Sequence, residues 1–173
     1  DIKTAYLHGI IPERHRIYLQ TPEGFPDPGP GKCYRFNRSA YGLKQAGYLW
    51  NCSLDRRLKS IGFRPSSEDA CLYCRTESNG KVTVIAVYVD DLVVKVARGP
   101  AEALIKRELA AIFEITFLGE CSAILGMRVT RDRDAGTIAV DQERYIIDMI
   151  RKYNYEKSRA YVTPVEPDIP IGR

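Results

Sequence analysis

The residues best suited to chemistry are two adjacent aspartates, Asp90 and Asp91, which stand inside the apolar stretch VIAVYVDDLVVKV at 84–96. The apolar residues on either side predict two strands that meet at the aspartates as a hairpin. Two full charges about 4 Å apart near a protein surface repel by roughly 4 kcal/mol at an effective dielectric constant of about 20. A divalent cation would turn this repulsion into attraction, because Mg²⁺ prefers oxygen ligands. Asp is also common in solvent-exposed turns, so the pair alone leaves both interpretations open.

The sequence offers little for other kinds of catalysis. Its two histidines, His8 and His15, belong to no Ser-His-Asp or Cys-His pattern. Its five cysteines include a lone C-x-x-C, Cys71 and Cys74, without the second pair that completes a zinc site. We therefore interpret the cysteines mainly as buried thiols.

Composition sets only broad limits. The 173 residues are 45% hydrophobic, enough for the core of one ordinary domain or part of one. A net charge of +4 is compatible with a polyanionic partner but does not require one. No apolar run is long enough to span a membrane, and no signal-peptide pattern opens the chain. Because the sequence does not begin with Met, we interpret it as a fragment.

Hydrophobic periodicity predicts a mixture of hairpins and helices. Helices are expected at 42–62, 99–113 and 142–154, and strands at 16–20, 70–76, 82–88, 92–96, 123–132 and 137–141. The strand at 82–88 is apolar on both faces, which is typical of a central, covered strand. This order of elements indicates an α+β domain with a largely antiparallel sheet.

The sequence also contains three separated motifs: DIKTAYLHG at 1–9, SAYGLKQAGYLW at 39–50 and YVDD at 88–91. They resemble the palm motifs of the reverse transcriptase of copia-type LTR retrotransposons, whose Pol polyproteins carry this domain. Further matching stretches follow in the same order: IYLQTPEGF (17–25), DACLY (69–73), FLGE (117–120), ILGMRV (124–129), DQERYI (141–146) and TP (163–164).

The resemblance implies a fold and a division of the chain. The fold is a reverse-transcriptase-like palm with a mainly antiparallel sheet and flanking helices, plus a partial thumb. Residues 1–130 would form the palm, with the N-terminal fingers missing. Residues 131–164 would form a connection and partial thumb, and residues 165–173 a flexible tail.

The resemblance also implies RNA-directed DNA polymerase activity, with two metal ions supporting nucleotidyl transfer onto a primer 3′-hydroxyl. The catalytic acids would be Asp1, Asp90 and Asp91, and these would bind two Mg²⁺ ions, or Mn²⁺ in their place. The carbonyl of Ile2 would add a further oxygen ligand.

Other matched positions would contact the substrates. Tyr6, Tyr41, Gly42 and Gln45 would bind the incoming nucleotide, although a core role for Tyr6 is the alternative. The positions expected to contact primer or template are Lys44, Tyr88, Val89, Gly126 and Arg128. Trp50 lies on the apolar stripe of its predicted helix and is interpreted as a packing residue.

The implied partners are an RNA or DNA template with its primer, deoxynucleoside triphosphates, and a second copy or the remainder of the Pol polyprotein, but no membrane. The implied location is intracellular, in cytoplasmic virus-like particles with a nuclear phase. A second hypothesis remains open, in which the chain is a truncated or domesticated, non-catalytic remnant that serves as a binding or structural module.

Overall fold

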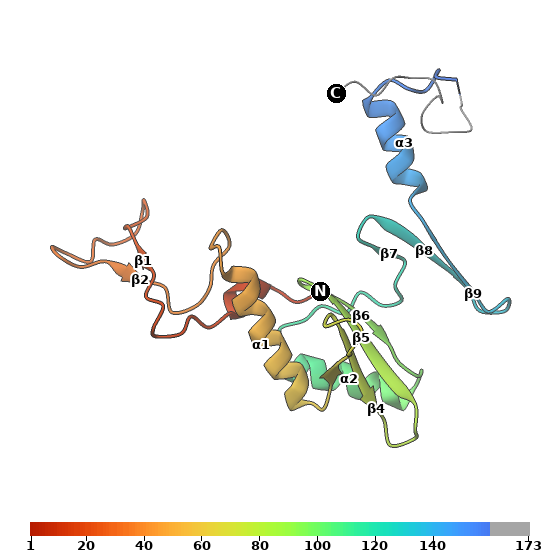
Figure 1. The fold of residues 1–173 in the computed structure, drawn as a ribbon, viewed down its shortest axis with the longest axis horizontal. Helices are drawn as coiled ribbons and strands as arrows, with labels where there is room; N and C mark the ends of the chain where they lie inside the picture. Colours follow the sequence, from red (N-terminus) through yellow and green to blue (C-terminus); the bar gives the residue numbers. More distant parts are fainter. Residues whose placement is uncertain (160–173) are drawn as a thin grey trace. The chain divides into compact units, whose positions relative to one another are not determined.

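The structure is a computed structural model, and it describes residues 1–159. The chain forms two compact units, Asp1–Gly119 and a second that begins at Glu120 (Figure 1). Both contain helices and antiparallel strands, which confirms the α+β class. The predicted boundary at residue 130 falls inside a strand, whereas the units divide after Gly119. The predicted tail at 165–173 lies outside the described residues.

The first unit contains a four-stranded antiparallel sheet, two α-helices and a short two-stranded ribbon. Its elements are η1 (Ala5–His8), β1 (Tyr18–Leu19), β2 (Tyr34–Arg35), α1 (Ala46–Ser60), β3 (Arg64–Pro65), β4 (Leu72–Thr76), β5 (Val82–Tyr88), β6 (Asp91–Lys95) and α2 (Pro100–Ile112). The sheet order is β3-β4-β5-β6, so β5 is central, as its sequence predicts. Only one face of β5 is buried, at Thr83 and Ile85, and Val82 on the other face is 41% exposed. The prediction that both faces are covered was therefore wrong.

The core lies between the sheet and the two helices (Figure 1). Leu54 and Leu58 of α1 and Ile105 and Leu109 of α2 are spaced four residues apart, so each pair lies on one face of its helix. On the sheet, Tyr73 and Ile85 are directly paired across β4 and β5 and are both buried. All six side chains belong to one hydrophobic cluster.

Helix α1 ends where the sequence predicts. The amide of Phe63 donates to the Leu58 carbonyl at 3.1 Å, and the amide of Gly62 donates to the Lys59 carbonyl at 3.1 Å. These two bonds define a Schellman motif, which needs a left-handed residue at its centre. Gly62 provides it with φ of 90°. The chain then turns directly into β3.

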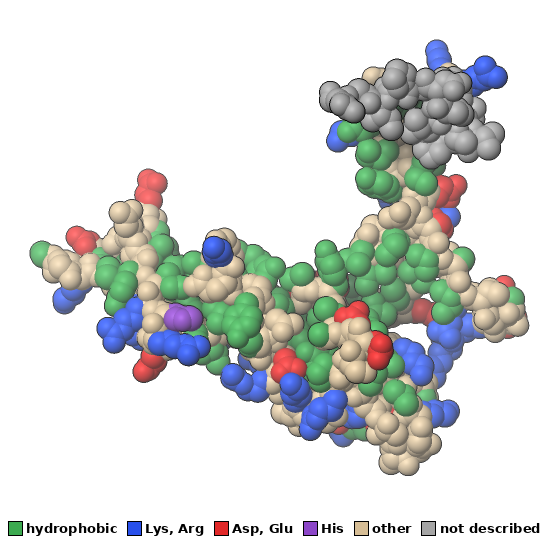
Figure 2. All heavy atoms as spheres, in the orientation of Figure 1, with side chains coloured by type: hydrophobic (Ala, Val, Ile, Leu, Met, Phe, Trp, Pro, Cys, Tyr) green, Lys and Arg blue, Asp and Glu red, His purple; other side chains and the backbone are tan. Residues whose placement is uncertain are grey.

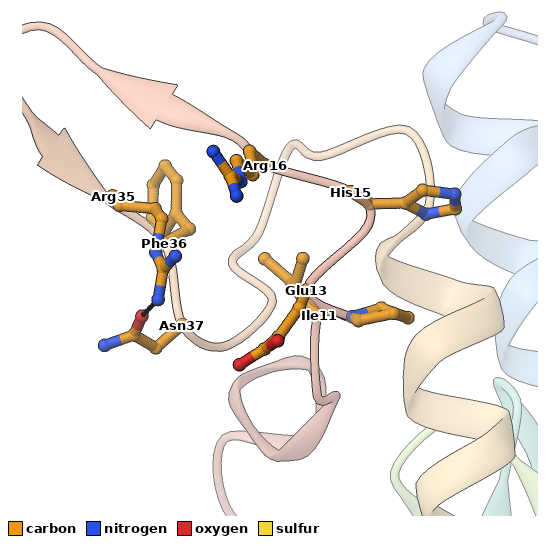
Figure 3. Close-up of a pocket in the computed structure, with 8 residues that line it drawn as sticks. Ile11, Glu13, His15, Arg16, Arg35, Phe36 and Asn37 are labelled. Carbon is orange, nitrogen blue, oxygen red and sulfur yellow. Dashed lines mark hydrogen bonds between the residues drawn. The ribbon is translucent and has the colours of Figure 1, made fainter.

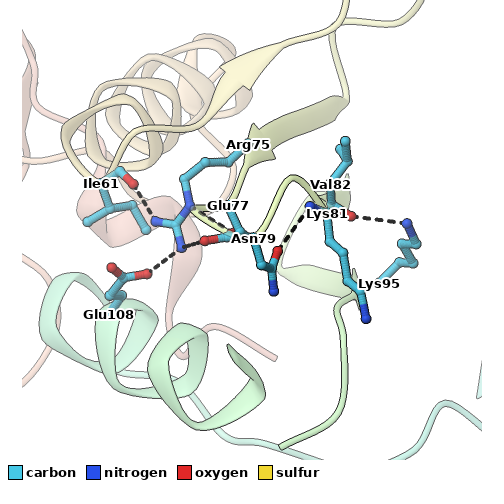
Figure 4. A network of polar contacts seen from close by, with 8 residues as sticks. All are labelled: Ile61, Arg75, Glu77, Asn79, Lys81, Val82, Lys95 and Glu108. Atoms are coloured by element: carbon cyan, nitrogen blue, oxygen red, sulfur yellow. Dashed lines mark hydrogen bonds and ion pairs between the residues drawn. The ribbon is translucent and has the colours of Figure 1, made fainter. Parts of the chain in front are cut away.

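A polar network around Arg75 joins the end of α1, β4 and α2 (Figure 4). Its guanidinium donates to the Ile61 carbonyl at 2.6 Å, forms ion pairs with Glu77 at 3.0 Å and Glu108 at 2.9 Å, and stacks 4.6 Å from the centre of the Phe63 ring. Burial alone would lower the pKa of Arg75, but the hydrogen bonds to the two glutamates raise it above its usual value. Arg75 is therefore a structural residue of the first unit.

The second unit contains a three-stranded antiparallel sheet of β7 (Ala123–Ile124), β8 (Met127–Asp132) and β9 (Thr137–Asp141), followed by α3 (Glu143–Lys152). The predicted hairpin with its loop at 133–136 and the predicted final helix are both confirmed. No residue of α3 is buried, although its apolar residues recur on one face.

The prediction that the cysteines are buried was wrong. Cys33 and Cys71 are exposed, and Cys52, Cys74 and Cys121 are partly exposed. Their apolar sequence neighbours suggested burial, but in a strand such as β4 those neighbours alternate between the two faces.

Candidate functional site

The β5–β6 hairpin carries both conspicuous aspartates, but it does not place both of them in the turn. The ladder pairs Tyr88 with Asp91, so the two turn residues are Val89 and Asp90, and Asp91 is the first residue of β6. The prediction of an Asp-Asp turn was therefore wrong by one residue. The φ angle is 55° at Val89 and is not positive at Asp90, as in a type II′ turn, where Gly usually occupies the first position.

The N-terminal segment lies beside this turn. Ile2 forms an antiparallel bridge with Ile115, flanked by backbone hydrogen bonds from Lys3 to Glu114 and from Thr116 to Asp1. The amide of Ile2 points the other way and donates to the carbonyl of Asp90 at 2.9 Å. The first and third motifs, far apart in sequence, are thus joined by one backbone hydrogen bond.

This arrangement determines where the predicted metal ligands lie. Asp1 is exposed, Asp90 and Asp91 are partly exposed, and Ile2 is 1% exposed. The N–H and C=O of a residue in a strand point to the same side, so the Ile2 carbonyl faces the hairpin side of its strand. The carboxylates of Asp90 and Asp91 therefore belong to the hairpin, and the carbonyl oxygen of Ile2 comes from the segment that is hydrogen-bonded to it.

Within residues 1–159, no three His, Cys, Asp or Glu side chains form a group that could hold a metal ion. The three predicted acids therefore do not make a closed cage of side chains. Mg²⁺ does not require one, because it commonly binds through one or two carboxylates, water molecules and substrate phosphates. The oxygen donors at the turn fit that mode of binding.

A second anchor holds the turn at the preceding carbonyl, that of Val89. The indole N–H of Trp50, on α1, donates to the carbonyl of Val89 at 2.7 Å. Trp50 is 3% exposed and packs against Phe113 with ring centroids 5.9 Å apart. The packing role predicted from its helical spacing is confirmed, but the hydrogen bond was missed, because no local pattern shows which carbonyl a distant indole reaches.

The predicted nucleotide residues come together in part. The rings of Tyr6 and Tyr41 meet edge to face with centroids 4.9 Å apart. Gly42 has a φ of 88°, a conformation that favours Gly, and Gln45 is the N-cap residue of α1. Lys44 is exposed. A cavity of about 160 Å³ beside these residues is lined by Tyr6, Trp50, Val87 and Val89, among others, so Tyr6 and the turn share one concave surface.

The remaining primer and template candidates are distributed over both units. Tyr88 is 57% exposed at the end of β5. Gly126 lies in the turn between β7 and β8. Arg128 already forms ion pairs with Asp141 at 2.9 Å and with Glu143 at 2.8 Å. A phosphate would have to compete with two carboxylates for this guanidinium.

Residues 10–38 form a segment that we call the arm, and a bridge between Ile10 and Arg38 joins its two ends. The arm carries a group of basic side chains that sequence reasoning missed. A cavity of about 60 Å³ in the arm is lined by His15, Arg16 and Arg35, among others (Figure 3). Figure 2 shows Lys and Arg side chains on this part of the molecule, with acidic side chains beside them. The run ERHR at 13–16 was the available signal.

Comparison with known proteins defines the family. The sequence profile of the reverse transcriptase (RNA-dependent DNA polymerase) family matches residues 1–167. The chain is 31% identical over its whole length to the retrovirus-related Pol polyprotein from transposon TNT 1-94 of Nicotiana tabacum, and covers 13% of that protein. It is 34% identical over 99% of its length to the putative transposon Ty5-1 protein YCL074W of Saccharomyces cerevisiae, and covers 54% of that protein.

A third relative, the retrovirus-related Pol polyprotein from transposon RE1 of Arabidopsis thaliana, is 28% identical over 96% of the chain, which spans 11% of it. No solved structure shows a significant match. The chain belongs to the reverse transcriptase family, and its relatives are Pol polyproteins of copia-type transposons, which confirms the resemblance drawn from the three motifs. Among the described residues, no helix has the length and apolar character needed to cross a membrane.

Proposed function

We propose that this chain provides the palm of an RNA-directed DNA polymerase that extends a primer 3′-hydroxyl. The observation that carries the proposal is the hydrogen bond from the Ile2 amide to the Asp90 carbonyl at 2.9 Å, which brings the first motif against the third. This contact brings the segment that carries Asp1 next to the turn that carries Asp90, as shared metal binding by the two acids requires.

In this proposal Asp1 and Asp90 hold the metal ions most directly, the Ile2 carbonyl adds an oxygen ligand, and Asp91 is the third acid. Two Mg²⁺ ions, or Mn²⁺, would activate the primer hydroxyl and stabilise the departing pyrophosphate. The residues of the chain contribute position and charge rather than a covalent nucleophile, which suits phosphoryl transfer.

The neighbouring residues would select and align the substrates. The ring of Tyr6, supported edge to face by Tyr41, would lie under the sugar of the incoming nucleotide and disfavour a 2′-hydroxyl. Gly42 and Gln45 would lie beside the new base pair. Tyr88 and Val89 would flank the primer end, and Lys44, Gly126 and Arg128 would contact the primer or template.

The test is primer extension on an RNA template with Mg²⁺ and deoxynucleotides, comparing this chain with a longer polypeptide that continues upstream of Asp1. We expect extension by the longer polypeptide and its loss on Asp90→Asn. If the longer polypeptide binds primer–template but does not extend it, the polymerase proposal is wrong.

The alternative is a non-catalytic remnant that serves as a binding or structural module. It is favoured by one observation, namely that the three acids do not form a three-ligand group within residues 1–159. The remnant predicts binding to primer–template, with log affinity falling as log salt rises, but no Mg²⁺-dependent extension by either polypeptide.

A further inference from the structure

The backbone of Asp90 is held on both sides by hydrogen bonds from other parts of the fold. The peptide group before the Asp90 Cα contains the Val89 carbonyl, which accepts a hydrogen bond from the Trp50 indole at 2.7 Å. The peptide group after its Cα carries the Asp90 carbonyl, which accepts from Ile2 at 2.9 Å. Because these two peptide planes set φ and ψ of Asp90, the two bonds fix the direction of its Cα–Cβ bond and so restrict the positions that its carboxylate can reach.

The turn needs such support because its own sequence opposes its conformation. Val89 has a φ of 55°, a region in which a β-branched residue is an outlier. Strained backbone of this kind persists only where the surrounding structure holds it. A turn released from its anchors would populate other conformations and would point Asp90 in other directions.

Trp50 is a rigid donor for this purpose. Its side chain is buried on α1, with Phe113 packed against it and the His8 ring at 5.9 Å between ring centroids. Ile2 cannot be varied in the same manner, because its contribution is a backbone amide that every residue except proline possesses. Among the side chains of residues 1–159, Trp50 is thus the one with a recorded hydrogen bond to the turn.

We propose that Trp50 is a positioning residue that aims the Asp90 carboxylate through its hydrogen bond to the Val89 carbonyl. This inference rests on the proposed function, since it assumes that Asp90 binds a divalent cation. Trp50 itself touches neither metal nor substrate in this role. Loss of the indole N–H should therefore weaken metal binding without abolishing the fold.

The first test uses the unchanged protein. The sequence contains one tryptophan, so a ¹H–¹⁵N spectrum shows one indole N–H signal. We expect this signal to be protected from solvent exchange, and we expect Mn²⁺ to broaden it reversibly through paramagnetic relaxation. Asp90→Asn should abolish the broadening. An indole that exchanges as freely as an exposed tryptophan, or that Mn²⁺ does not broaden, overturns the positioning role.

The second test removes only the donor. Trp50→Phe keeps an aromatic ring in the core but loses the N–H, and we expect Mn²⁺ affinity to fall about two- to ten-fold, the effect of one lost hydrogen bond. Tyr48→Phe is the matched control, because it removes a polar hydrogen from the same helix at a side chain that is 72% exposed. It should leave Mn²⁺ affinity unchanged.

A rescue variant separates positioning from general damage. Asn tolerates the left-handed region better than Val, so Val89→Asn should restore much of the Mn²⁺ affinity that Trp50→Phe loses. Affinity is measured under conditions in which every variant is fully folded, so a general gain in stability from Val89→Asn does not by itself raise it. If Trp50→Phe binds Mn²⁺ as well as the unchanged protein, the role of Trp50 is overturned and the metal site stands. If the unchanged protein shows no Mn²⁺ binding that depends on Asp90, the metal site fails and the role of Trp50 fails with it.

Discussion

Within residues 1–159, two hairpins have two-residue turns, and they reach their conformations by different means. The β7–β8 turn consists of Leu125 and Gly126, with φ of 52° and 75°. Positive φ at both positions is the type I′ pattern, for which Gly is a preferred residue. The β5–β6 turn contains no Gly, has φ of 55° at Val89, and is held by hydrogen bonds from Trp50 and Ile2.

The difference shows where local sequence decides structure and where the fold decides it. In the β7–β8 turn a glycine supplies one of the two positive φ angles without strain, and Leu125 alone is held in an unfavourable region. In the β5–β6 turn the required backbone is unfavourable and two tertiary bonds impose it. A strained turn that carries one carboxylate and adjoins a second is best explained by a function that needs these carboxylates there.

The largest expected effect comes from the acid in the strained turn. In the polypeptide that continues upstream of Asp1, Asp90→Asn should reduce primer extension at least about 100-fold, because a positioned charge that stabilises the transition state is lost. Its melting temperature should not fall, since the change also removes repulsion between Asp90 and Asp91. Extension assays and thermal unfolding measured on the same preparation check both parts.

Asp134→Asn is the control for this substitution. Asp134 is an exposed acid in the loop between β8 and β9, so the variant makes the same chemical change in a hairpin that carries no proposed metal ligand. It should leave extension within about two-fold, as expected for an exposed surface position. Equal losses in the two variants would mean that overall charge, rather than the site, governs the activity.

The second effect concerns the locally encoded turn. Gly126→Ala should destabilise the β7–β8 hairpin by about 1–2 kcal/mol, because an L-residue is forced into the left-handed region. A Cβ at this position meets no atom within 4 Å, so crowding does not contribute. Gly47→Ala is the matched control, since Gly47 lies inside α1 and its Cβ also meets nothing within 4 Å. The control should gain up to about 1 kcal/mol of stability. Amide exchange should therefore show lower protection in the β7–β8 hairpin for Gly126→Ala and higher protection in α1 for Gly47→Ala.

The same contrast explains what the sequence alone could predict. The helix expected at 42–62 appears as α1, Ala46–Ser60, because its apolar spacing and Gly62 are local signals. Its start lies later than predicted because Gly42, with φ of 88°, belongs to the preceding turn. The β8–β9 hairpin was found for the same reason, namely alternating strands around a loop that contains Gly136.

What the sequence could not reveal depends on contacts between distant segments. The turn was placed at Asp90 and Asp91, whereas the ladder pairs Tyr88 with Asp91, and no Gly or Asn marks the true turn. The strand expected at 16–20 pairs only at Tyr18–Leu19, because its partner at 34–35 is equally short. The approach of Ile2 to Asp90 could be inferred only from resemblance to a family, not from periodicity.

A smaller effect should follow when strain is removed from the anchored turn. Val89→Asn should raise the free energy of unfolding by about 1 kcal/mol, because Asn adopts a positive φ more readily than a β-branched residue. Denaturant unfolding should show a higher midpoint with an unchanged slope. Leu125→Asn is the matched comparison, because it places Asn at the positive φ of the β7–β8 turn. A loss of stability confined to Val89→Asn would show that packing of the Val89 side chain outweighs the strain.

The smallest effect concerns the ion pair in the second unit. The hydrogen bond from Arg128 is the main cause that lowers the pKa of Asp141 below its usual value. A carboxylate with a lowered pKa stabilises the folded state above its unfolded-state pKa, and this contribution is lost as pH falls through the lowered folded-state pKa. Amide protection of the β8–β9 hairpin should therefore decrease slightly in acid.

High salt should reduce this pH dependence, because the pair is exposed and screened by ions. Asp141→Asn should remove the part of the pH dependence that the ion pair contributes.

The same variant also tests the primer-contact proposal, since it removes one of the two carboxylates that form ion pairs with Arg128. If Arg128 binds phosphate, Asp141→Asn should increase primer–template affinity at low salt and make its salt dependence steeper. An unchanged slope of log affinity against log salt would mean that Arg128 does not contact phosphate. Its ion pairs with Asp141 and Glu143 would then serve only the structure of the second unit.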